Sequence, residues 1–161
     1  MLPDRVRAHH IRIMDELSRH LKEVAEAAAR EFAGYSDSTA AKPIQPGGWS
    51  RKQVLGHLID SASNNHQRFV RALLADELKW PSYDQEGCVR AQRYQDAQWT
   101  DLVKLWTSYN RFLAHVLAGV PPAKLGTRCL IGDNAPMTLE ELAADYLHHM
   151  QHHLEQIRSG T

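Results

Sequence analysis

The chain has 161 residues, of which 43% are apolar, and its 19 Lys+Arg balance 19 Asp+Glu. This composition predicts a single globular domain over residues 1–161 and excludes disordered, collagen-like and disulfide-scaffold proteins. A formal net charge of zero argues against general nucleic-acid binding, which needs a basic surface. There is no membrane-length apolar run and no signal-peptide core, so we expect a cytoplasmic protein without a membrane partner.

The cysteines and histidines indicate which reactive or metal-binding side chains the protein could use. Cys88 and Cys129 form no CxxC pair, so both are predicted to be free thiols. Histidine is over-represented, with ten residues, four of them in the run HHMQHH at 148–153.

In chain order, the first predicted helix covers about Pro3 to Phe32, with proline in its first turn. The second begins after Ser50, with Gln53 completing a capping box, and runs to about Ala75. The segment 76–95 is too long for a simple turn, so we expect a long loop containing one short helix.

A third helix is predicted from the cap Asp96 to Gly119, ahead of two prolines. The segment 127–136 (TRCLIGDNAP) has turn residues between short apolar runs and favours a small hairpin. The fourth helix begins at the cap Thr138, with Glu141 completing a second capping box, and ends near Arg158. Four long helices predict an all-α, four-helix bundle.

The fourth helix has a clear apolar stripe, and only two of its clustered histidines lie on that side. At 100° per residue, His153 falls within the stripe and His149 at its edge, whereas His148 and His152 face solvent. Imidazoles four residues apart on a helix can bind one cation, and a third ligand is expected from a facing helix.

The second helix offers two candidates for the third ligand, His57 and His66, and its apolar stripe does not favour His57. His57 is in line with Ser61, Asn64 and Arg68 along a polar strip, which an ordinary solvated face would explain equally well. The histidines outside these two helices (His9, His10, His20 and His115) have no such neighbours and are expected to lie on the surface or fill helix positions.

These residues resemble the DinB-like superfamily, and within it the YfiT-like metal-dependent hydrolases. The resemblance covers about residues 47–157 and rests on the order and spacing of several short motifs. They are Gly48–Trp49–Ser50, His57–Leu58–Ile59–Asp60–Ser61, Asn64, Arg68–Phe69, Tyr83–Asp84, Met137–Thr138–Leu139 and the run from Tyr146 to His153.

The resemblance implies an up-down four-helix bundle, often a homodimer, with nickel or zinc bound by His57, His149 and His153. It thereby chooses His57 over His66. Gln156 matches a common family position and is expected to contact a metal-binding histidine without binding the metal itself. Asp60 is expected to have the same role. Many members place an extra acid near the metal, and in this chain Asp60 or Asp84 could supply it. The general base stays unassigned. We expect a substrate pocket formed by four residues, Asn64, Arg68, Tyr83 and Asp84.

Three neutral nitrogen ligands leave coordination positions open, as in catalytic sites. The leading hypothesis is therefore a metal-dependent enzyme acting on a small molecule. The family precedent is S-transfer from a low-molecular-weight thiol such as bacillithiol or mycothiol, but hydrolysis could use the same site. One alternative is a non-catalytic metal-binding or stress-response bundle. Another is a helical interaction module in which the histidines are surface and packing residues.

Overall fold

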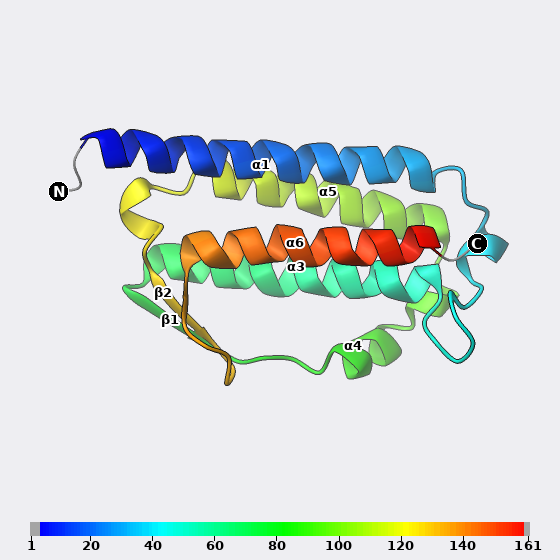
Figure 1. The fold of residues 1–161 in the computed structure, drawn as a ribbon. Coiled ribbons are helices and arrows are strands. Elements are labelled where there is room, and N and C mark those ends of the chain that lie inside the picture. The colour runs from blue at the N-terminus through cyan, green and yellow to red at the C-terminus, as the bar shows by residue number, and fades with distance from the viewer. Residues whose placement is uncertain (1–3, 160–161) are drawn as a thin grey trace.

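The computed structural model describes residues 4–159, with side chains from residue 13 onward. Pro3 and the side chains of His9 and His10 lie outside this range. The four long helices are α1 (Asp4–Phe32), α3 (Arg51–Leu74), α5 (Trp99–Ala118) and α6 (Leu139–Ser159), and they form the predicted four-helix bundle (Figure 1).

Local capping explains where α3 and α6 begin. Before α3, the Gln53 amide N–H donates to Ser50 Oγ at 3.2 Å, and the Ser50 N–H donates to Gln53 Oε1 at 2.9 Å. Before α6, Thr138 and Glu141 make the same reciprocal pair, at 3.2 and 2.7 Å. Both predicted capping boxes are confirmed.

The predicted start of α5 is wrong. Asp96 lies in the short 3₁₀ helix η1 (Tyr94–Asp96), where its carboxylate accepts from Arg93. The helix begins at Trp99, whose backbone N–H donates to Asp37 Oδ1 at 2.8 Å. Asp37 opens the short helix α2 (Asp37–Ala40), so the acceptor at this helix start comes from a distant part of the chain.

The helix directions follow from the long connection between α3 and α5. Figure 1 shows α1 and α6 running in one direction and α3 and α5 in the other. Because α3 and α5 are parallel, consecutive long helices do not all alternate, which differs from the up-down order that the resemblance implies. Residues 75–98 return along the bundle and include the predicted short helix, α4 (Gln85–Gln92). The main helix pairs are α1 with α5, α5 with α3, and α3 with α6. One side of α3 thus faces α5 and another faces α6.

A three-stranded sheet lies beside the bundle, in the order β1-β2-β3. The predicted hairpin is the antiparallel pair β2 (Arg128–Ile131) and β3 (Met137–Thr138), preceded by the 3₁₀ helix η2 (Pro122–Lys124). Gly132 has a φ of 56° in its turn, where a Cβ would lie 3.0 Å from the Ser82 side chain. The sequence did not predict β1 (Glu77–Trp80), which pairs with β2 in parallel.

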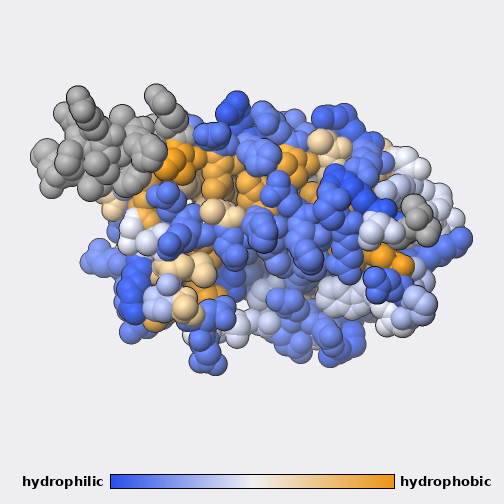
Figure 2. All heavy atoms as spheres, viewed as in Figure 1, coloured by the Kyte–Doolittle hydropathy of each residue, from blue (hydrophilic) through white to orange (hydrophobic). Residues whose placement is uncertain are grey.

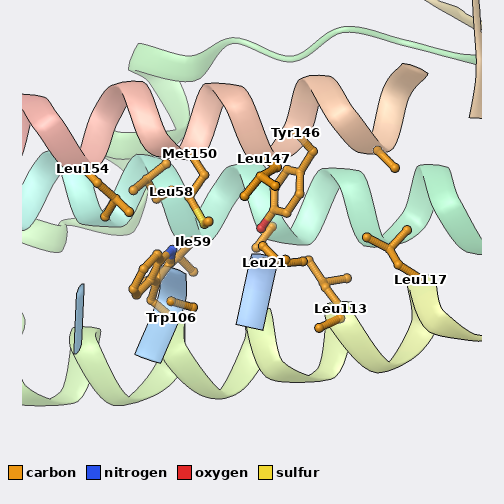
Figure 3. Packing of buried hydrophobic residues seen from close by; sticks show 14 of the residues in the cluster. Leu21, Leu58, Ile59, Trp106, Leu113, Leu117, Tyr146, Leu147, Met150 and Leu154 are labelled. Atoms are coloured by element: carbon orange, nitrogen blue, oxygen red, sulfur yellow. The ribbon is translucent and has the colours of Figure 1, made fainter. Parts of the chain in front are cut away.

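The core lies between the helices (Figure 3), where α5 contributes Trp106 and Leu113, α3 contributes Leu58, and α6 contributes Met150 and Leu154. Hydrophilic residues cover most of the face in Figure 2, and hydrophobic residues gather along α1. Within residues 4–159, no helix has the length and apolar character needed to cross a bilayer. Both cysteines are free thiols, as predicted.

Candidate metal centre

Helices α3 and α6 bring three histidines together: His57 from α3, and His149 and His153 from α6. Their ligand nitrogens all lie within 4.8 Å of one another. The ring centroids are 4.6 to 5.2 Å apart. We call these three residues the three-histidine cluster. Among the described side chains it is the one group of three or more metal-ligating residues this close together.

The spacing of the nitrogens fits one shared cation. His57 Nε2 lies 3.3 Å from His149 Nε2. Two zinc–nitrogen bonds of about 2.05 Å at a tetrahedral angle place their nitrogens about 3.3 Å apart. A direct N–H···N bond between the two imidazoles would also fit this distance, but it would join only two of the three imidazoles. A single cation could be shared by all three nitrogens.

Electrostatics keep these imidazoles neutral. Burial, together with a smaller effect of neighbouring imidazoles, lowers the pKa of His57 and that of His149 to about 4. Burial also lowers the pKa of His153. None of the three forms an ion pair with a carboxylate in the described part of the chain. At neutral pH each imidazole therefore has a lone pair to offer a metal.

Groups behind the cluster orient its rings. His153 Nδ1 lies 2.8 Å from Gln156 Oε1, so Nδ1–H donates and the lone pair is left on Nε2. His149 Nδ1 lies 3.5 Å from Ser61 Oγ, and the Trp49 ring packs against His57 at 5.6 Å between centroids. Gln156 is thus in the position that the family resemblance implies.

Asp60 has a different set of contacts. Its Oδ1 accepts hydrogen bonds from Tyr94 Oη at 2.7 Å and from Gln92 Nε2, and burial raises its pKa. No hydrogen bond joins Asp60 to the three-histidine cluster. Tyr94 packs on Gly56, where a Cβ would lie only 2.1 Å from the tyrosine ring. In this structure Asp60 links α3 to the end of α4 and to η1.

A polar cavity of about 180 Å³ opens beside His149. Residues from α3, α6 and the loops around the sheet line it: Ser61, Asn65, Arg68, Ser82, Tyr83, Gln85, Ile131, Asn134, Asp145, Tyr146 and His149. The parallel pairing of β1 with β2 brings the segment after β1 next to the hairpin turn. The larger groove, of about 650 Å³, lies between α1 and α5 and contains none of the three histidines.

Two of the four expected pocket residues, Arg68 and Tyr83, line this cavity, and two do not. Asn64 Nδ2 donates to the Asp60 carbonyl oxygen at 2.9 Å. Asp84 is exposed and caps α4 by accepting from the Gly87 N–H at 2.9 Å. Both side chains form hydrogen bonds with the backbone of nearby residues, and neither lines the cavity.

The polar strip on α3 is buried, so its interpretation as a solvated face is wrong. His57, Ser61 and Arg68 are 0, 3 and 9% exposed. The strip continues through Asn65 rather than Asn64, one helical turn after Ser61. The sequence interpretation missed Asn65 and Asp145, although the four-residue spacing from His57 to Ser61 to Asn65 was a usable signal.

The remaining described histidines are not part of the cluster, although the His152 ring packs against His153 at 5.2 Å between centroids. His66 Nδ1 is 3.2 Å from Tyr109 Oη on α5, so it faces a different helix from His57. The other described histidines are exposed, as predicted: His20, His115, His148 and His152.

The chain is similar to proteins described as metal-dependent. The family model of the DinB superfamily matches residues 8–157. The "Putative metal-dependent hydrolase YfiT" of Bacillus subtilis (strain 168) is 26% identical, over 91% of this chain and 79% of that protein. A "Putative metal-dependent hydrolase" of Bacillus mycoides (strain KBAB4) is 23% identical, over 91% of this chain and 84% of its own.

The fold is also shared with a solved structure. YfiT from Bacillus subtilis, described as "a probable metal-dependent hydrolase with an unusual four-helix bundle topology", superposes with a TM-score of 0.70 at 23% identity. The match covers 98% of this chain and 87% of that one. Because the family model matches residues 8–157, the chain belongs to the DinB superfamily.

Proposed function

We propose that the three-histidine cluster binds one divalent metal ion and that the chain is a metal-dependent enzyme acting on a small molecule. The observation that carries this proposal is the convergence of three neutral imidazole nitrogens within 4.8 Å, with no carboxylate paired to them among the described residues. The names of two relatives, which describe metal-dependent hydrolases, support it.

Three nitrogen ligands would leave coordination positions open, as catalytic metal sites require. A bound zinc or nickel ion would supply a Lewis acid that lowers the pKa of a water or a thiol. The protein's own residues orient the ligands: Gln156 fixes the tautomer of His153, and Trp49 packs against the ring of His57. The polar cavity lined by His149 offers a small molecule space beside one member of the cluster.

Metal content tests the binding step. Purified wild-type protein incubated with zinc or nickel and then desalted should hold about one ion per chain by mass spectrometry. The His149→Ala variant should lose the ion, whereas His148→Ala, which removes an exposed histidine from the same helix, should retain it. Metal at 100 times its Kd should also stabilise the wild type by about 2.7 kcal/mol. Equal metal content in all three proteins would overturn the proposal.

Turnover tests the enzymatic step. The loaded wild type is assayed with a thiol plus an electrophile such as monochlorobimane, and separately with activated esters and amides. Metal-dependent conjugation would support thiol S-transfer, and metal-dependent cleavage would support hydrolysis. Stoichiometric metal with neither reaction would favour the non-catalytic metal-binding bundle instead.

A further inference from the structure

Arg68 is a buried cation with few partners. It is 9% exposed, and its one hydrogen bond runs from Nη1 to Asn65 Oδ1 at 3.3 Å. Its Nε is buried without a partner. No carboxylate within residues 13–159 lies within ion-pair distance of it, although Asp145, which lines the same cavity, attracts the guanidinium from farther away. Buried arginines are usually paired, because an unpaired buried charge is costly. Nη2 makes no hydrogen bond to the described residues and is not fully buried, so the guanidinium has a donor available for a ligand.

The cavity beside Arg68 limits what that ligand can be. Its volume of about 180 Å³ corresponds to roughly six waters, enough for a charged group and a few carbon atoms. The titratable groups that line it with Arg68 are Tyr83, Asp145 and His149. Because Asp145 also carries a negative charge, a singly charged anion fits this cavity better than a dianion.

We propose that Arg68 binds a carboxylate group of the small-molecule substrate, with Asn65 positioning the guanidinium. The planar guanidinium can donate two parallel N–H bonds to a carboxylate. His149 lines the same cavity, so a molecule held at Arg68 extends toward the three-histidine cluster. This inference rests on the proposed function, because it takes that cluster as the reacting end of the site.

Direct binding tests the proposal without relying on turnover. The Arg68 Nε–H signal is followed by ¹H–¹⁵N NMR during titration with acetate, and with acetamide as a neutral molecule of the same shape. Acetate should shift the signal saturably and acetamide should not. Arg68→Gln should bind acetate at least tenfold more weakly, measured on backbone signals of the cavity. Arg71→Gln, on the same helix but stacked on Trp80 at 4.5 Å, should match the wild type.

Three results would overturn the proposal: no saturable shift with acetate, equal affinity in Arg68→Gln, or tighter binding of inorganic phosphate than of acetate. Arg68→Lys keeps the positive charge but loses the planar guanidinium, so it should also bind acetate more weakly. This variant replaces Arg68→Gln if the latter does not fold. The titration is run on metal-free and zinc-loaded protein. If the protein binds acetate but no metal, the proposed function is refuted and this inference is not. If it binds metal but no acetate, this inference is refuted and the proposed function is not.

Discussion

Acidification should destabilise the metal-free protein through His57. The pKa of His57 is about 4 in the folded chain, against 6.5 for an unperturbed histidine. Between these values the unfolded state binds a proton that the folded state does not, so the free energy of unfolding falls as pH falls. The slope for one such group approaches 1.4 kcal/mol per pH unit, or roughly 3 kcal/mol across the window.

That loss is a large share of the 5–15 kcal/mol that typically stabilises a domain. His149, whose pKa is also lowered to about 4, should act in the same direction. The carboxyl groups with lowered pKa values, such as Asp37 and Glu141, lose their contribution only at lower pH, below their unfolded pKa values. The interval from about pH 6.5 to 5 therefore lies above the titration of these carboxyl groups. Asp60, whose pKa is raised by burial, acts in the opposite direction as pH falls, so a variant is needed to isolate the histidine.

Urea denaturation of metal-free protein, followed by tryptophan fluorescence, measures this slope at about pH 7, 6 and 5. The His57→Gln variant lacks the titrating group, and its mean slope between pH 7 and 5 should be about 0.9 kcal/mol per pH unit smaller than that of the wild type. His115→Gln removes an exposed histidine of α5 and should leave the slope unchanged. Equal slopes for wild type and His57→Gln would refute the reasoning.

Three further substitutions test the packing around the site. Gly56→Ala should destabilise the protein by about 1–3 kcal/mol in urea denaturation, because the new Cβ would collide with the Tyr94 ring; an unchanged midpoint would contradict this packing. Gln156→Leu should weaken zinc binding by about 10- to 100-fold in competition with a chelator dye, since the last histidine of the cluster loses its acceptor; unchanged affinity would remove the orienting role. Tyr146→Phe should cost about 1–3 kcal/mol by calorimetry, because the buried Asn110 Oδ1 loses its donor, and a neutral result would mean that another group replaces it.

The sequence predicted those parts of the fold that depend on neighbouring residues. The boundaries of α3 and α6 follow from capping pairs three residues apart, which can be read locally. The start of α5 could not be predicted, because its acceptor, Asp37, is 62 residues away. The pairing of β1 with β2 is equally remote, since it joins residues about fifty positions apart in parallel register.

The same difference between local and long-range contacts explains which residues of the candidate site the sequence could predict. His149 and His153 share one helix, so helical spacing alone assigned them to one face. The choice between His57 and His66 depends on which helix each faces, and α3 packs against both α5 and α6. Because α3 packs on two sides, it buries polar residues that lie outside its apolar stripe. In the sequence, the polar strip from His57 to Arg68 therefore looks like a solvent-exposed face. Its burial follows from the position of α6, which places His149 and Asp145 opposite that strip. The cation-binding nitrogens and the unpaired guanidinium thus share one origin, the polar seam between α3 and α6.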